Sequence, residues 1–236
     1  MNEPKQSTPL KLKILYEDNH LIAVLKPHRV LTQGDDTGDI SLFDLAKSYL
    51  KERYQKPGNV FLGLLHRIDR PVAGIVLFAK TSKAASRISE QMRQRSFSKN
   101  YLAVVEGQVT PGEGNLTHYL EFDESKRNTE VYEENNGHRD KAILHFRSVH
   151  KSKVTSCLAI NLETGRKHQI RSQLAFIRHP IVGDRKYGAK NTYFYGAIAL
   201  LATKIEFMHP TEKKLITIEL KPEDYPNREW WSKHCG

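Results

Sequence analysis

The chain has 236 residues, which suits one sizeable α/β domain or two small ones, and no Gly/Ser-rich or Pro-rich linker divides it. Its 37 Lys and Arg residues outnumber its 27 Asp and Glu residues, so the formal charge is +10 and the pI is near 9.5. Such a balance favours a polyanionic partner, and nucleic acid is the leading candidate. The longest apolar runs, such as Ile198–Ala202, fall far short of the roughly 20 residues that cross a bilayer, so we expect a soluble protein with no membrane partner.

The N-terminal segment and the cysteines indicate the cellular compartment of the protein. Residues 1–11 are polar and contain no apolar stretch of the kind that secretory signals carry, so we expect a flexible tail before a single domain over 12–236. Cys157 lies in an apolar strand-like run and Cys235 at the C-terminal end; two cysteines so placed indicate neither a disulfide framework nor a metal site. A reducing, cytoplasmic compartment is the expectation that follows.

Apolar periodicity predicts the elements of the first half of the chain. Short runs rich in Ile, Val and Leu predict strands over 12–16 and 21–25, joined by a tight turn. Behind Ser41, a good N-cap, apolar residues recur at helical spacing, so we expect a helix over 41–54. The next predicted elements are a strand-like segment over 59–65, a buried strand over 74–79, a helix capped by Ser82 and a strand over 99–107.

The second half of the chain alternates polar and apolar stretches. Residues 122–141 form the most polar part of the chain, and we expect a mobile insertion there. Apolar residues have helical spacing from Gly165 to Ile177, and 178–188 is a loop dense in Gly, Pro and cations. Two hairpins are predicted, of 142–149 with 155–162 and of 197–207 with 215–220. The elements together predict an α/β (α+β) fold: a largely antiparallel mixed central sheet with flanking helices and loops that form a basic catalytic cleft.

Residues 66–79, which read HRIDRPVAGIVLFA, contain the most informative pattern. Asp69 stands between Arg67 and Arg70, and a nearby opposite charge favours the ionised form of a carboxyl group. An ionised carboxylate can act as a nucleophile. Considered alone, however, an Asp among arginines is more often part of a surface salt-bridge cluster in a turn. Other parts of the sequence are therefore needed to choose between a nucleophile and a salt-bridge cluster.

The common catalytic patterns are absent from the sequence. It contains no H-E-x-x-H and no paired C-x-x-C, which leaves a zinc site without support, and neither a P-loop nor a G-x-S-x-G elbow. Cationic residues instead gather at 165–171, where the start of a helix would expose backbone N–H groups to a phosphate. What remains is an Asp in a basic setting, a tyrosine in a strand and an arginine cluster on a helix.

Four blocks in this order resemble the signature segments of the RluA-type family of RNA pseudouridine synthases. They are 16–27 (YEDNHLIAVLKP), 66–81, 99–107 and 162–188, and the resemblance covers about 15–210. It implies that Asp69 is the catalytic aspartate, which attacks the target uridine at the base or at the ribose carbon. It also implies that Tyr101 stacks against the flipped base and takes the proton from C5, and that Arg171 pairs with the aspartate.

The resemblance implies RNA as the partner, and the reaction needs little else. Converting uridine to pseudouridine breaks one glycosidic bond and makes another without redox change, so no metal or cofactor is expected. The base must leave its stack, which requires an aromatic surface to receive it and cations for the flanking phosphates. The residues expected to contact the RNA are His66, Arg67, Arg70, Arg166, Lys167, His168, Gln169 and Arg185.

The chain departs from the family pattern in three places. Val72 and Ala73 stand where relatives more often have a small polar pair, and Leu201 precedes Ala202 where many have a histidine. The segment before Leu15 is shorter than the additional N-terminal RNA-binding domain of many relatives, so we expect substrate choice, between tRNA and rRNA, to come from the catalytic domain. We expect a monomer without an obligate protein partner.

Two other functions are compatible with parts of the pattern. A catalytically silent RNA-binding module could retain the cleft, although the joint presence of Asp69, Tyr101 and Arg171 argues against it. A phosphotransferase with an aspartate nucleophile would want further carboxylates for magnesium near Asp69, and none follows in the motif.

Overall fold

The computed structural model describes residues 12–194 and 196–236. The predicted tail, 1–11, lies outside this range. The strands are β1 (Lys13–Glu17), β2 (Leu21–Lys26), β3 (Gly63–Leu64), β4 (Ala73–Ala79), β5 (Ser98–Glu106), β6 (Glu113–Asp123), β7 (Asn128–Tyr132), β8 (Asp140–Lys151), β9 (Thr155–Leu162), β10 (Leu200–Met208) and β11 (Leu215–Glu219). The helices are α1 (Leu42–Arg53), α2 (Ser82–Arg93), α3 (Gln169–Phe176) and α4 (Arg228–Cys235), with 3-10 helices at Arg185–Tyr187 and Pro222–Asp224.

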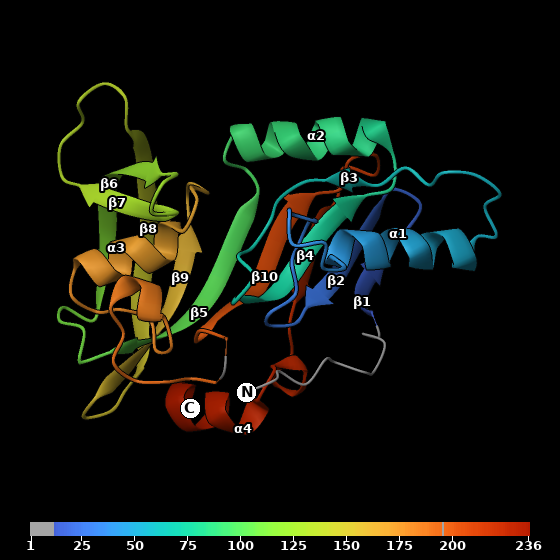
Figure 1. Cartoon of the computed structure of the whole chain (residues 1–236). Coiled ribbons are helices and arrows are strands. Elements are labelled where there is room, and N and C mark those ends of the chain that lie inside the picture. The colour runs from blue at the N-terminus through green and yellow to red at the C-terminus, as the bar shows by residue number, and fades with distance from the viewer. Residues whose placement is uncertain (1–11, 195) are drawn as a thin grey trace.

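One sheet organises the fold (Figure 1). Its strand order is β1-β2-β4-β10-β5-β9-β8-β6-β7, while β3 pairs with β4 and β11 with β10. The pairing of β4 with β10 is parallel, and the other pairings between the named strands are antiparallel. The predicted α+β fold with a largely antiparallel mixed sheet is therefore confirmed.

Strand β4 lies at the centre of one half of this sheet. All seven of its residues are buried, as expected for the run that is apolar at every position. Gly74 has φ +131°, and a Cβ at this position would lie 2.3 Å from the carbonyl oxygen of Ala202 on β10. Only glycine permits this backbone conformation and this close approach, which sets where β4 begins beside β10.

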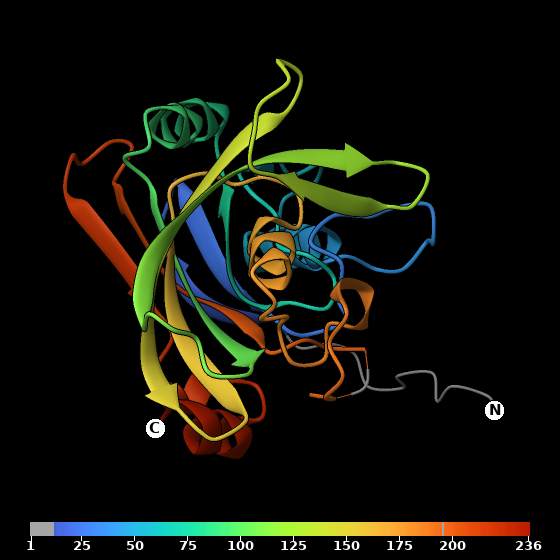
Figure 2. The same ribbon diagram turned by 90° about the vertical axis from the view of Figure 1, so that its left-hand side faces the viewer.

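The helices cover the sheet at separate places. Helix α2 packs on β3, β4 and β10, while α3 contacts β6 and β7 and lies inside the curve of the green and yellow strands in Figure 2. Helix α1 has the predicted cap, because Ser41 and Asp44 form a capping box, whereas α2 is capped by Thr81 and not by Ser82. Within the part of the chain that the structure describes, no helix has the length and apolar character needed to span a membrane.

Residues 122–141 are not the mobile insertion that their composition predicts. They complete β6, form β7 and begin β8, and β6 pairs with both of these strands. On β6 the polar residues Glu113, Asn115, Thr117 and Glu121 are exposed while Leu120 is buried, and on β7 the buried residue is the polar Thr129. Polarity on one face therefore hid the strands, which is the usual ambiguity of a half-exposed sheet.

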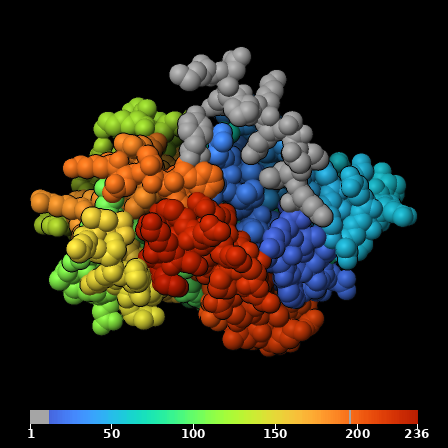
Figure 3. Space-filling view, turned by 90° about the horizontal axis from the view of Figure 1, so that it is seen from below, coloured from blue at the N-terminus to red at the C-terminus, as the bar shows by residue number. Residues whose placement is uncertain are grey.

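The prediction that the two cysteines remain unpaired is also wrong. Cys157 on β9 forms a disulfide with Cys235, and their Cα atoms lie 5.2 Å apart. The sequence did not predict α4, the helix that returns the C-terminus to β8 and β9 (Figure 3). Trp231, in the middle of α4, is fully buried and fixes the helix in this position.

Candidate active site

The turn that carries Asp69 lies between β3 and β4. It is closed by a hydrogen bond from the Val72 N–H to the Asp69 carbonyl oxygen, at 3.0 Å. The hydroxyl of Thr32, in the loop after β2, donates to the Ile68 carbonyl at 2.8 Å and accepts from the Ile68 N–H at 3.3 Å. Because the backbone is held immediately before Asp69 and within the turn itself, the carboxylate projects from a fixed position.

Lys26 also stabilises this turn, through hydrogen bonds to backbone carbonyl oxygens. Its side chain is completely buried, and its ammonium donates to the carbonyl oxygens of Val30, Pro27 and Arg70 at 2.7, 3.1 and 3.2 Å. Burial lowers the pKa of Lys26 to about 7, while the charge of Asp69 acts in the opposite direction. His28 adds a further clamp, since its Nδ1 donates to the Pro71 carbonyl at 2.8 Å.

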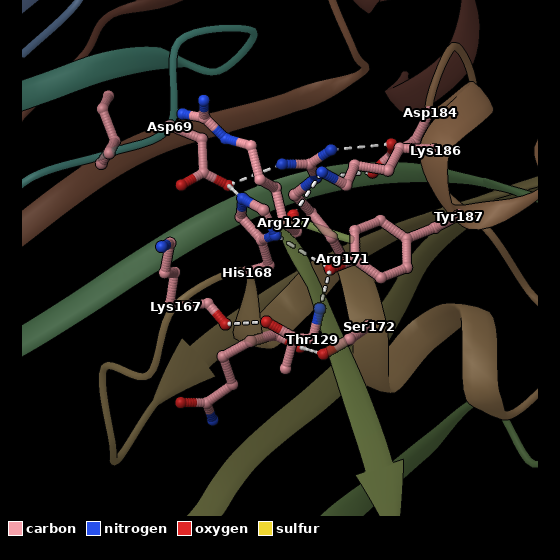
Figure 4. Close-up of polar contacts among 12 residues, drawn as sticks. Asp69, Arg127, Thr129, Lys167, His168, Arg171, Ser172, Asp184, Lys186 and Tyr187 are labelled. Atoms are coloured by element: carbon pink, nitrogen blue, oxygen red, sulfur yellow. Dashed lines mark hydrogen bonds and ion pairs between the residues drawn. The ribbon is translucent and has the colours of Figure 1, made fainter. Parts of the chain in front are cut away.

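The guanidinium of Arg171, on α3, binds two carboxylates at once (Figure 4). Its Nε and one terminal nitrogen donate to the two oxygens of Asp184 at 2.7 and 2.9 Å. The other terminal nitrogen donates to Oδ2 of Asp69 at 2.9 Å. Burial alone would lower the pKa of Arg171, but the hydrogen bonds and charges of Asp184 and Asp69 raise it, so the guanidinium stays charged.

His168 faces the same oxygen of Asp69. Its Nε2 lies 3.8 Å from Oδ2 of Asp69, and its Nδ1 lies 2.9 Å from the hydroxyl of Tyr187 (Figure 4). That hydroxyl accepts from the Thr129 N–H at 3.0 Å, so it can donate its own proton to Nδ1 and leave the Nε2 proton facing Asp69. Burial lowers the pKa of His168 to about 4, and the histidine is neutral at pH 7.

Tyr101, on β5, completes the pocket around Asp69. Its side chain is largely buried, and its hydroxyl makes no hydrogen bond to the residues that the structure describes. Burial, followed by the negative charge of Asp69, raises the pKa of Tyr101, so it remains a phenol at neutral pH. The pocket, about 70 Å³, is lined by Arg67, Ile68, Asp69, Val72, Tyr101, Leu162, Arg166, His168, Gln169, Ile170, Arg171 and Leu200.

Five cations expected to contact RNA are exposed. Arg70 pairs with Asp39 at 2.6 Å and Arg166 with Asp140 at 3.1 Å, so Arg171 and not Arg70 is the ion-pair partner of Asp69. The ammonium of Lys167 lies 3.1 Å from the centre of the Phe122 ring. The remaining two are Arg67, at the pocket, and Arg185, in the 3-10 helix that follows Asp184.

Two other residues predicted to contact RNA, His66 and Gln169, use their side chains in hydrogen bonds within the protein. The Nε2 of His66 accepts from the Leu77 N–H at 3.0 Å, and burial lowers the pKa of His66 to about 3. The amide of Gln169 is buried, with its Nε2 donating to the Ile143 carbonyl at 3.1 Å and its Oε1 accepting from the Thr164 hydroxyl at 2.9 Å. RNA contacts by these two side chains stay predictions.

The helix that bears Arg171 begins later than its spacing predicts. Helix α3 starts at Gln169, and the preceding His168 has a left-handed backbone with φ 55°. Arg166 and Lys167 therefore lie in the connection before the helix and not on its first turn. This conformation turns the His168 ring toward Asp69, which a helical residue at 168 would not reproduce.

Sequence reasoning missed Asp184, the second partner of Arg171. The carboxylate lies in a segment predicted to be a loop, and no local pattern distinguishes it from the exposed acids of the chain. Asp184 is nevertheless only 1% exposed. Among the described residues there is no group of three or more His, Cys, Asp or Glu side chains that could hold a metal ion.

The fold and this site together define a class of protein. A family model described as RNA pseudouridylate synthase matches residues 20–176. The ribosomal large subunit pseudouridine synthase C of Buchnera aphidicola is 30% identical over 219 residues, covering 90% of this chain and 67% of that protein. The chain therefore belongs to the RNA pseudouridylate synthase family, whose members are isomerases that convert uridine to pseudouridine.

Further relatives agree with this assignment. An uncharacterized RNA pseudouridine synthase of Bacillus subtilis is 29% identical over 221 residues, covering 92% of this chain and 71% of that protein. The structure of human RNA pseudouridylate synthase domain containing 4 superposes with a TM-score of 0.72 at 20% identity, over 89% of this chain and 88% of that one. This structural similarity confirms the pseudouridine synthase fold.

Proposed function

We propose that this chain converts a uridine of structured tRNA or rRNA to pseudouridine, with Asp69 as the nucleophile and with the target base flipped out of its stack. The observation that carries the proposal is the Asp69 carboxylate. Its side chain is 28% exposed at the pocket, and Arg171 and His168 both approach Oδ2. The other oxygen, Oδ1, has no hydrogen bond among the described residues and is free to attack.

The reaction is balanced without any external reagent. The N1–C1′ bond of uridine breaks, a C5–C1′ bond forms, and the hydrogen on C5 is replaced by one on N1. Asp69 assists by adding through Oδ1, either to C1′ of the ribose or to the pyrimidine ring, and leaves again as the carboxylate. Arg171 fixes the orientation of Oδ2 throughout and balances the charge that returns to Asp69.

Tyr101 is suited to receive the flipped base and its proton. The ring offers a stacking face at the pocket, and the hydroxyl has no other hydrogen-bond partner among the described residues. Because its pKa is raised, Tyr101 is not a phenolate before the reaction begins. It takes the C5 proton as its own proton passes to the released carboxylate of Asp69, which gives a proton to N1 of the rearranged base, so the tyrosine and the aspartate both end the cycle unchanged.

The exposed cations around the pocket support RNA as the substrate. Arg67 and Arg166 line the pocket itself, and Arg185 follows the Asp184 that anchors Arg171. Cations at such positions can hold the phosphates on both sides of a flipped nucleotide and form the basic cleft. Relatives named for the ribosomal large subunit favour rRNA over tRNA. The proposal keeps a monomer in the cytoplasm, although the Cys157–Cys235 disulfide removes the support that the cysteines gave to a reducing compartment.

The test is a comparison of Asp69→Asn with the wild-type protein on unmodified transcripts of tRNA and large-subunit rRNA. Wild type should form pseudouridine, read by mass spectrometry of the digested RNA, and Asp69→Asn should form none while its Kd for the same RNA changes by less than about threefold. The matched control is Asp39→Asn, which removes an exposed carboxylate paired with Arg70 and should retain activity. A wild-type protein that binds RNA without modifying it would favour the silent binding module instead.

A further inference from the structure

A second groove adjoins the Asp69 pocket on the side of α2. It has a volume of about 410 Å³ and shares Tyr101, Arg67 and Arg166 with that pocket. Its lining further includes His66, Arg93, Lys99 and Gly165. Four of the lining residues are Lys or Arg and none is Asp or Glu, so the groove is suited to an anion.

Lys99 occupies the inner part of this groove. It lies two residues before Tyr101 on β5, so both side chains project from the same face of the sheet. Its ammonium rests against the Gly165 backbone, where a Cβ would come within 2.9 Å of Nζ. Lys99 is partly buried, and burial lowers its pKa. Among the described residues no side chain or carbonyl pairs with this ammonium.

The neighbouring groups do not neutralise Lys99. Arg93 pairs with Glu90, its Nε donating at 3.0 Å, and Arg166 pairs with Asp140, so both arginines already have a carboxylate. His66 is kept neutral, with its pKa lowered to about 3 by burial and then by the charge of Lys99. Lys99 and Arg67 are thus the two cations of the groove that have no carboxylate partner in 12–194 and 196–236.

A partly buried ammonium without a counterion is unfavourable in the free protein. Buried charges in proteins are normally paired, because the lost hydration is otherwise uncompensated. An anion that enters the groove offsets this cost, and the groove is lined by Tyr101 as well as by Lys99.

We propose that Lys99, together with Arg67, binds one backbone phosphate of the RNA strand adjacent to the flipped uridine. The inference rests on the proposed function, because it takes the strand that enters the Asp69 pocket to be the ligand. A lysine is suited to the task, since its compact charge and three donors accept a phosphate from many directions. Arg67 lines both cavities and connects this phosphate to the base in the pocket.

The experiment uses a fluorescein-labelled ten-nucleotide oligouridine as the probe and measures Kd over a series of salt concentrations. Lys99→Gln should bind roughly tenfold more weakly, and the slope of log Kd against log salt should fall by about 0.7, the contribution of one phosphate on a single strand. Lys99→Arg should restore most of the affinity. The matched control is Lys204→Gln, since Lys204 is also partly buried but pairs with Glu206. It should leave both Kd and slope unchanged.

A stability measurement separates binding from a structural role. Removing an uncompensated charge should leave the melting temperature of Lys99→Met unchanged or higher, whereas a lysine that supports the fold would lower it. If Lys99→Gln keeps the wild-type salt slope while wild type forms pseudouridine, the phosphate site is refuted and the proposed function stands. If wild type neither binds the oligouridine nor modifies any transcript, both are overturned. If Lys99→Gln no longer binds inorganic phosphate but keeps the wild-type salt slope with the oligouridine, Lys99 binds free phosphate and not the RNA strand, and the proposal is refuted.

Discussion

Arg171 and Asp184 form a buried, two-point ion pair that leaves one nitrogen of the guanidinium free for Asp69. Asp184 is 1% exposed and binds through both oxygens, while the side chain of Asp69 is 28% exposed and binds through one. The two carboxylates therefore have different tasks. Asp184 holds the arginine in place, and the arginine holds the carboxylate that faces the substrate.

This asymmetry predicts that Asp184→Asn and Asp69→Asn, two isosteric substitutions, differ in their effect on stability. Asp184→Asn should lower the free energy of unfolding by roughly 3 kcal/mol, because it leaves a buried guanidinium with half of its charge compensation lost. It should also slow pseudouridine formation by roughly 10²-fold, since a displaced Arg171 no longer orients Asp69. Urea unfolding and single-turnover assays measure the two quantities.

Asp69→Asn should abolish turnover at little cost in stability, because Asp69 is more exposed and Arg171 keeps Asp184. The pair of variants thus serves as its own control. Equal stability losses in both would mean that the two carboxylates are equivalent, and the assignment of separate tasks would fail.

Tyr101→Phe should separate stacking from proton transfer. The variant keeps the ring in the pocket but lacks the hydroxyl, so Kd for RNA should stay within about twofold while the rate of product formation falls by 10²–10⁴-fold. Single-turnover kinetics with saturating enzyme make this comparison. Tyr49→Phe is the matched control, because its hydroxyl bonds Glu17 away from the site and its loss should leave the rate unchanged. A fully active Tyr101→Phe would remove the hydroxyl from the mechanism.

Much of the site was accessible from sequence because its parts occur in short blocks. The position of Asp69 between Arg67 and Arg70, the Pro71 turn and the apolar run of β4 are all local features, so the sequence predicts this segment directly. Arg171 lies 102 residues from Asp69, and its pairing came from the family resemblance and not from any periodicity. The structure then placed the two side chains in contact.

What the sequence could not supply was information about long-range contacts. The buried state of Asp184, the return of α4 to β9 and the lack of a carboxylate partner for Lys99 among the described residues all depend on segments far apart in the chain. The strands over 122–141 were missed because one polar face obscured their alternation. Each of these features is fixed by tertiary packing, which local propensity does not encode.

Gly74→Ala should be among the most destabilising single-methyl additions in the chain. The new Cβ would overlap the carbonyl oxygen of Ala202, at 2.3 Å, and the φ of +131° disfavours any residue with a side chain. We expect a loss of roughly 3 kcal/mol or more in urea unfolding. Gly58→Ala, where nothing lies within 4 Å, is the control and should change stability by less than about 1 kcal/mol. A tolerant Gly74→Ala would contradict the close packing of β4 on β10.

Acidification should destabilise the protein through histidines that are buried in their neutral form. Burial lowers the pKa of His28 to about 4, His168 to about 4 and His66 to about 3, from 6.5 in an exposed histidine. Between pH 6.5 and 4 the unfolded chain binds protons that the folded chain does not. Stability is therefore complete above pH 6.5 and falls as the pH drops toward 4.

His28 offers the cleanest test of this dependence, because it is only 8% exposed and lies outside the pocket around Asp69. Its contribution to the loss should reach at most about 3 kcal/mol by pH 4, from a difference of about 2.5 pH units. Urea unfolding of His28→Asn at pH 7.5, 6.0, 5.0 and 4.5 should show a shallower decline than wild type, since asparagine can still donate to the Pro71 carbonyl but does not titrate. The exposed His138→Asn should follow the wild-type curve. A wild-type stability that rises on acidification, or a His28→Asn curve parallel to it, would show that this histidine is not held neutral by the fold.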